Sequence, residues 1–107
     1  MKEATLIPPQ AVTGDVTSAA FQLGDLYRYS VHAIFSGSDR AGSLIIQGSN
    51  DGANWVAVST TAVSSAADKM LTLEGHYRYV RAFWDNTSGT GNLTVYLVAK
   101  ENIVKGA

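Results

Sequence analysis

Apolar and polar residues alternate along most of this chain with the two-residue period of a β-strand. The clearest case is residues 27–35, where one face carries Tyr27, Tyr29, Val31, Ala33 and Phe35. Residues 92–100 repeat the pattern, with Leu93, Val95, Leu97 and Ala99 on one face. Further strands are predicted over residues 18–23, 43–49, 55–61, 69–73 and 77–85. No segment carries the i, i+3, i+4, i+7 apolar spacing of an amphipathic helix.

The sequence Asn50-Asp51-Gly52 predicts a tight turn between two of these strands. These residue types tolerate positive φ or hydrogen-bond to their own backbone. Ile46 precedes the turn and Val56 follows it, so the pattern indicates a β-hairpin. About seven or eight short strands separated by turns predict an all-β fold, a single antiparallel β-sandwich of jelly-roll type.

A short motif occurs twice, as Tyr27-Arg28-Tyr29 and again as Tyr77-Arg78-Tyr79. Each copy is followed by a polar loop, a glycine and an apolar strand. We interpret the two copies as hairpins with similar positions in two packed sheets. An internal duplication is the alternative, and two copies are too few for a solenoid.

The two ends of the chain differ from the middle. Residues 1–10 contain Ile7-Pro8-Pro9, and proline cannot donate a hydrogen bond to a central strand. We therefore expect an extended N-terminal arm over 1–10, a sandwich domain over 11–101 and a loose tail over 102–107. Both ends are candidates for reaching a neighbouring subunit, so Ile7, Pro8 and Pro9 are expected interface residues.

The composition favours association with other surfaces. Only 16% of the 107 residues are charged, below the usual share of about 25%. A neutral surface on a β-rich domain promotes self-association, and a homo-oligomer, either a dimer or a trimer, is expected. The eight Lys and Arg residues are scattered and the net charge is −1, which argues against nucleic-acid binding.

Other classes are disfavoured by what the sequence contains. It has no cysteine, hence no disulfide and no thiol chemistry. It has no run of about 18 apolar residues, so no membrane span is expected. Met1-Lys2-Glu3 is not followed by an apolar stretch, so we expect no signal peptide and synthesis in the cytoplasm.

The residue types that support catalysis are not grouped in a recognisable motif. His32 and His76 are the only histidines, and neither lies in a nucleophile motif. Asp51 with Asn50 and Asn54 resembles part of a calcium loop but lacks its regular spacing and closing Glu, so the turn interpretation is preferred. We expect no catalytic residue, no metal and no cofactor, and the chain is not predicted to be an enzyme.

The strand predicted over residues 77–84 is apolar on both faces. Tyr77, Tyr79 and Phe83 share one face with Arg81. A sandwich strand normally has one wet face, and Tyr and Arg are enriched at the centres of interfaces. These four residues are therefore expected interface residues, although their polar ends also have the length to reach water past a sheet edge.

The two tryptophans are assigned to the core. Trp55 directly follows the turn and is expected to cap one end of the sandwich, with carbohydrate stacking as the alternative. Trp84 ends the strand 77–84 and is expected in the core or at its rim, with a position in an interface as the alternative.

The run Ile46-Gln47-Gly48-Ser49-Asn50-Asp51-Gly52-Ala53-Asn54-Trp55, followed by Tyr77-Arg78-Tyr79-Val80-Arg81, resembles the discoidin, or coagulation factor 5/8 C-type, jelly-roll group. That resemblance implies a carbohydrate-binding module, with Asn50, Asp51, Asn54 and Trp55 as its glycan-binding residues. The chain lacks the terminal cysteines of that group.

The run from Gly42 to Lys100 is similar to small head decoration, or cement, proteins of tailed phages. The similarity is carried by its end, Ser88-Gly89-Thr90-Gly91-Asn92-Leu93-Thr94-Val95-Tyr96-Leu97-Val98-Ala99-Lys100. It implies a virion protein on the capsid exterior that binds the phage major capsid protein and copies of itself. We expect this function; the alternatives are the carbohydrate-binding module and a tail or baseplate accessory protein.

Overall fold

The computed structural model describes residues 2–12, 14–23, 26–36, 41–64, 67–75, 77–88 and 91–101. These residues form strands and connecting turns, and none of them forms a helix that could cross a membrane. The strands are β1 (Lys2–Val12), β2 (Val16–Thr17), β3 (Phe21–Gln22), β4 (Leu26–Ser36), β5 (Ala41–Ser49), β6 (Val56–Ser64), β7 (Ala67–Glu74), β8 (Tyr79–Ser88) and β9 (Gly91–Glu101).

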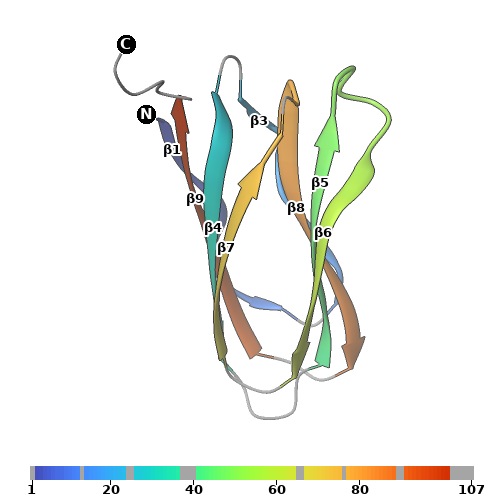
Figure 1. The fold of residues 1–107 in the computed structure, drawn as a ribbon. Coiled ribbons are helices and arrows are strands. Elements are labelled where there is room, and N and C mark those ends of the chain that lie inside the picture. Colours follow the sequence, from blue (N-terminus) through green and yellow to red (C-terminus); the bar gives the residue numbers. More distant parts are fainter. Residues whose placement is uncertain are drawn as a thin grey trace.

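The strands form two sheets that face each other (Figure 1). One sheet has the order β1-β9-β4-β7; the other has the order β2-β8-β5-β6, with β3 also pairing with β8. Every pairing is antiparallel. With β2 and β3 taken as one interrupted strand along β8, this is the eight-stranded arrangement of a jelly roll. The predicted fold class is confirmed.

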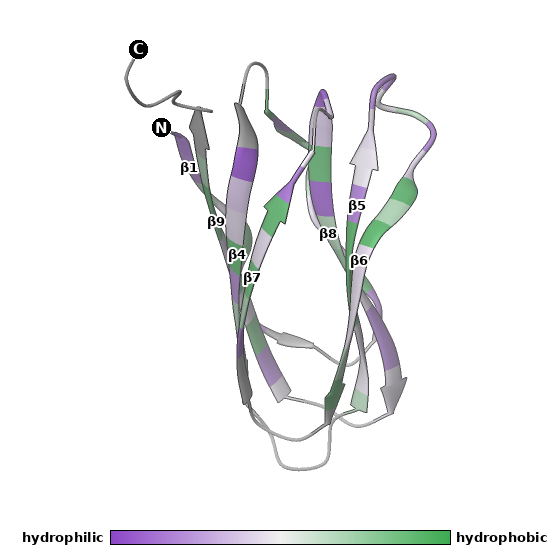
Figure 2. Cartoon of the chain, in the orientation of Figure 1, coloured by the Kyte–Doolittle hydropathy of each residue, from purple (hydrophilic) through white to green (hydrophobic). Residues whose placement is uncertain are grey.

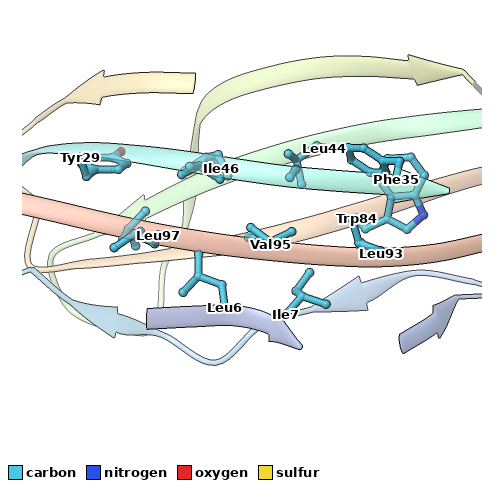
Figure 3. Close-up of a cluster of buried hydrophobic side chains, with 14 of the residues drawn as sticks. Leu6, Ile7, Tyr29, Phe35, Leu44, Ile46, Trp84, Leu93, Val95 and Leu97 are labelled. Atoms are coloured by element: carbon cyan, nitrogen blue, oxygen red, sulfur yellow. The ribbon is translucent and has the colours of Figure 1, made fainter. Parts of the chain in front are cut away.

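The alternating pattern of the sequence directs one face of each strand into a single core. Tyr29, Val31, Ala33 and Phe35 of β4 are at most 2% exposed, as predicted from their spacing. The inner faces of β5, β8 and β9 complete the core, which Figure 3 shows between the sheets; the largest of their fully buried side chains are Leu44, Ile46, Val80, Trp84, Leu93 and Leu97.

Trp84 is the largest fully buried side chain, which confirms its assignment to the core. Its ring centroid lies 5.1 Å from that of Phe35, with the ring planes tilted by 47°. Its indole Nε1 donates a hydrogen bond to Asn86 Oδ1 at 3.1 Å. The ring therefore joins the two sheets through Phe35 while its polar atom is satisfied at the end of β8.

The N-terminal segment is an edge strand, not the projecting arm expected from its prolines. β1 pairs with β9 from Lys2 opposite Ala99 to Val12 opposite Gly91. Leu6 and Ile7 are buried in the core, at 8% and 0% exposure. Pro8 and Pro9 are exposed and fall within a register shift, which fits proline at an irregular edge strand. Residues 102–107, the expected tail, lie outside the described residues.

The repeated Tyr-Arg-Tyr motif does not mark two hairpins. β4 and β5 lie in different sheets, as do β8 and β9, so each copy precedes a crossover between sheets. Tyr29 points into the core, whereas Tyr79 lies on the outside of its sheet, because its neighbour in sequence, Val80, is fully buried. The copies share a sequence but not an environment. The β5–β6 connection is the hairpin that the sequence predicts.

Candidate interaction surface

The turn between β5 and β6 is held by side chains that hydrogen-bond to their own backbone. Ser49 Oγ accepts from Gly52 N at 2.9 Å, and Asp51 Oδ1 accepts from Ala53 N and Asn54 N, each at 2.8 Å. Gly52 has a φ of 77°, a conformation that favours glycine. Residues 50–55 separate the two strands, so the loop is longer than the tight turn predicted from Asn50-Asp51-Gly52.

Both carboxylate oxygens of Asp51 are engaged within this turn. Asn54 Nδ2 donates to Oδ2 at 2.7 Å, and the Ser49 hydroxyl donates to Oδ1 at 2.9 Å. The backbone N–H of Asn54, followed by that of Ala53, lowers the pKa of Asp51 well below its usual range. In the described part of the chain, no three His, Cys, Asp or Glu residues are grouped as metal ligands would be. The contacts of Asp51 are those of a turn residue.

Replacing Asp51 with alanine is expected to lower the melting temperature, because two turn N–H groups lose their acceptor. Asp51→Asn should retain more stability, since its amide oxygen can still accept. The pKa of Asp51 is lowered in the folded state. The ionised carboxylate therefore stabilises the fold at pH values above the ordinary pKa of Asp, and this stabilisation is lost as the pH falls. Thermal unfolding from neutral to acid pH should therefore show a steeper loss for the wild type than for Asp51→Asn. Parallel curves for the two proteins would contradict this.

The turn is also fixed to the segment that precedes β8. Asn50 Oδ1 accepts from Arg78 N at 3.1 Å, across 28 positions of sequence. Asn50, Asp51 and Asn54, three residues predicted for glycan binding, thus all use side-chain atoms in contacts within the fold. This arrangement orders the turn but leaves fewer of its polar groups available to a sugar.

An outer face forms on the sheet β2-β8-β5-β6, on the side away from the core. Val80, Ala82 and Trp84 of β8 are fully buried, so the intervening Tyr79, Arg81 and Phe83 lie on the opposite side. Figure 2 shows bands of hydrophobic and hydrophilic residues along β8. On β5, Ile45 lies opposite Phe83 and Gln47 lies opposite Arg81. We call Ile45, Gln47, Trp55, Tyr79, Arg81 and Phe83 the outer face; all six are half-buried.

Arg81 is held in place on the outer face by two neighbours. Its Nε donates to Gln47 Oε1 at 2.7 Å, and its guanidinium carbon lies 4.2 Å from the centroid of the Trp55 ring. A cation over an indole face at this distance is attracted by about 0.5–1 kcal/mol at an exposed site. The guanidinium is therefore already oriented before any partner arrives, so less side-chain entropy is lost on binding.

Two sequence predictions about aromatic residues are corrected by these positions. Trp55 does not belong to the buried core and lies half-buried against Arg81. Tyr77 precedes β8 and does not continue its alternation; it packs against the core, where a Cβ on Gly48 would come within 3.1 Å of its ring. Tyr77 is therefore not part of the outer face, whereas Tyr79, Arg81 and Phe83 are brought together there.

The remaining predicted interface residues lie elsewhere. Ile7 is fully buried and has no surface to offer a partner. Pro8 and Pro9 are exposed on β1, in the other sheet. Sequence reasoning missed Ile45 and Gln47, whose alternation with the buried Leu44 and Ile46 was the available signal.

The outside of the sheet β1-β9-β4-β7 has a different character. His32 lies beside Tyr96, with ring centroids 6.3 Å apart, and opposite Met70, which is 63% exposed. Arg28 and Glu74 form an exposed ion pair at 3.2 Å. The surface depressions on this sheet are shallow, one beside Ser30, Thr72 and Val98 and one along β1 and β9. His76 lies outside the described residues.

The protein is thus an antiparallel jelly-roll sandwich, and its candidate interaction site is the outer surface of one sheet. No protein-family model matches the chain, and no curated protein matches its sequence. Among solved structures, the PBSX exported protein XepA is similar with a TM-score of 0.80 and 16% identity, covering 99% of this chain and 39% of XepA.

Two further solved structures are similar over nearly their whole length. The SPBc2 prophage-derived protein YomS has a TM-score of 0.58 and 16% identity, covering 92% of this chain and 90% of YomS. The Yersinia pseudotuberculosis-derived mitogen has a TM-score of 0.58 and 17% identity, covering 98% of this chain and 92% of the mitogen. At these identities the similarity shows a common β-sandwich fold.

Proposed function

We propose that the chain is a non-enzymatic structural protein of a phage particle, which decorates the capsid exterior by binding the major capsid protein through its outer face. The observation that carries this proposal is the outer face itself. Phe83, Ile45 and Trp55 supply apolar area there, and Arg81 supplies an oriented charge. Aromatic and arginine side chains at the centre of a patch are the usual source of binding energy between proteins.

Two of the structural comparisons support a phage setting. YomS is a prophage-derived protein, and XepA is an exported protein of PBSX. The chain spans 39% of XepA, so the whole activity of that protein is not transferred to it. What the fold offers in common is a rigid sandwich with broad sheet faces, which suits attachment to a shell better than it suits chemistry on a small molecule.

Attachment to a shell would stabilise the capsid through the surface area buried by each bound chain and through the many copies bound. Each chain that binds the assembled capsid but not its free subunits stabilises the assembled state by mass action. Self-association into a dimer or trimer would add avidity, because neighbouring sites on a shell are held at fixed spacing. The chain would be made in the host cytoplasm and join the particle there, without contact with nucleic acid or membrane.

The carbohydrate-binding alternative receives less support from the contacts described above. It requires Trp55 to present its ring beside Asn50, Asp51 and Asn54. One face of that ring is occupied by Arg81, and the turn residues hydrogen-bond to the fold. A tail accessory role uses the same outer face and is separated from the head role by experiment.

The test is to locate the chain on purified particles of the phage that encodes it. Filled heads and tails are separated on a density gradient and probed with an antibody against the chain. We expect the wild type on filled heads, at least tenfold less of Phe83→Ser, and wild-type levels of Met70→Ser, which alters the other sheet. Recovery with tails only, or only as free protein, would overturn the proposal. Melting temperatures confirm that both variants are folded.

A further inference from the structure

Each sheet of the sandwich ends in two edge strands, and the four edges differ in how they are protected. The edges are β1 and β7 in one sheet, and β6 and the interrupted strand β2 and β3 in the other. An edge strand presents unpaired backbone N–H and C=O groups, so another strand can add to it. Natural proteins prevent this with prolines, bulges, inward-pointing charges or very short strands.

Three of the edges carry such devices. β1 contains Pro8 and Pro9 and two register shifts. β2 and β3 contain two residues each. Between them, Ser18 N donates a hydrogen bond to Ala82 O, and Ser18 Oγ accepts one from Ala82 N, each at 2.8 Å. β7 places Lys69 opposite the fully buried Ala33, so this charge lies on the inner side of the sheet. These edges are poor templates for a further strand.

β6 is a long edge strand that contains no charged residue, proline or glycine. Its sequence is VAVSTTAVS, nine residues of which five are the β-branched Val and Thr that favour strands. In Figure 2 it shows only hydrophobic and weakly polar colours along its length. One extra residue, Val58, interrupts its pairing with β5, and the pairing is regular from Ser59 to Ser64. Since β6 is the last strand of its sheet, the backbone groups on its far side have no neighbouring strand among the described residues.

We propose that β6 pairs antiparallel with β6 of a second copy of this chain, with Thr61 facing Thr61 across a two-fold axis. The register argues for a second copy as the occupant. With Thr61 opposite Thr61, the antiparallel register places Thr60 opposite Ala62 and Ser59 opposite Val63. The two residues of each pair lie on the same side of the sheet, as strand geometry requires. Hydroxyl and small apolar side chains meet, and no like charges do. An isologous contact of this kind closes as a dimer.

This pairing has a consequence for the outer face. The two-fold axis runs perpendicular to the joined sheet, so the outer faces of both copies lie on the same side. The dimer is thus a double-width surface with two copies of Arg81 and Phe83. The short ladder alone buries less than a standard interface, so we expect the free dimer to be weak and populated only at high concentration. The pairing itself does not depend on the proposed attachment to a capsid.

The first experiment exchanges charge at the predicted contact and is read by sedimentation velocity from the micromolar to the millimolar range. Thr60 and Ala62 are exposed, so both accept charge without loss of the core. Thr60→Lys with Ala62→Lys places like charges opposite each other twice and should raise the dimer dissociation constant at least tenfold. Thr60→Lys with Ala62→Glu places opposite charges there and should dimerise as well as the wild type or better.

The control variant carries lysines at Met70 and Thr72, exposed positions on the edge strand β7 of the other sheet, and should dimerise like the wild type. A wild type that stays monomeric throughout the concentration range would overturn the proposal, even if it binds a strand of another protein. So would equal behaviour of the Lys/Lys and Lys/Glu variants, since the register would then be wrong.

The second experiment uses the absence of cysteine in the chain. Residues directly opposite in an antiparallel pair have Cα atoms about 4.5–5.5 Å apart, within the span of a disulfide. Thr61→Cys should therefore form a disulfide-linked dimer under mild oxidation, whereas Thr72→Cys should remain largely monomeric. Equal rates of cross-linking in the two variants would contradict pairing through β6.

Discussion

Replacing Trp84 with alanine is expected to lower the free energy of unfolding by about 3–5 kcal/mol, the usual range for removing a buried large aromatic side chain. Trp84 is 0% exposed, packs on Phe35 from the facing sheet and uses its indole N–H in a hydrogen bond. The substitution leaves a cavity between the sheets and an Asn86 side chain that loses this donor. For a domain of this size, such a loss is a large part of the total stability.

The matched control is Trp55→Ala, which removes the other tryptophan. That ring is half-buried on the outer face and its main described contact is Arg81. We expect a loss of about 1 kcal/mol or less, close to the value of an exposed cation–π contact. Urea unfolding followed by circular dichroism compares the two variants without depending on tryptophan fluorescence. Similar losses in the two would mean that the core is not centred on Trp84.

Raising the pH from 10 to about 12 is expected to lower the free energy of unfolding by up to about 2 kcal/mol through Tyr29 alone. Burial, with a smaller contribution from the nearby Tyr77, raises the pKa of Tyr29 to about 12. The unfolded chain loses this proton near pH 10 while the folded chain keeps it, so unfolding becomes more favourable as the pH rises through this interval. Below pH 10 both states are protonated and the contribution is constant.

Tyr29→Phe isolates this effect. The Tyr29 hydroxyl is buried without a hydrogen-bond partner among the described residues, so its removal should leave stability at neutral pH unchanged or raise it by about 1 kcal/mol. Urea unfolding at neutral and alkaline pH should show a smaller alkaline loss in Tyr29→Phe than in the wild type. Tyr96→Phe, at a position 39% exposed, is the control and should retain the wild-type loss. An alkaline loss that is equal in all three proteins would refute the assignment to Tyr29.

Strand alternation was sufficient to predict the fold and much of the core. The buried faces of β4 and β9 are those given by the two-residue period. The same rule failed for β1, because the register shifts at Ile7 break the period and the prolines suggest a free arm. Proline excludes a segment from a central strand, but it is compatible with an edge strand whose other residues enter the core.

The outer face was only partly predictable. Tyr79, Arg81 and Phe83 follow from alternation within β8, but Tyr77 was assigned to the same face because the start of the strand at Tyr79 is not visible in the sequence. The position of Trp55 depends on Arg81, a contact between the loop of residues 50–55 and the strand β8. Contacts of this type arise from the register of β5 and β8, which no local pattern encodes.

The register of β1 against β9 has a practical consequence for protein engineering. Because Lys2 lies opposite Ala99, the strands β1 and β9 run side by side, and the start of β1 lies next to the end of β9 (Figure 1). A short linker between these ends would therefore join the first and last strands without disturbing either sheet. The same geometry allows the whole sandwich to be inserted into a surface loop of a carrier protein, which would display it without separating the two halves of the carrier.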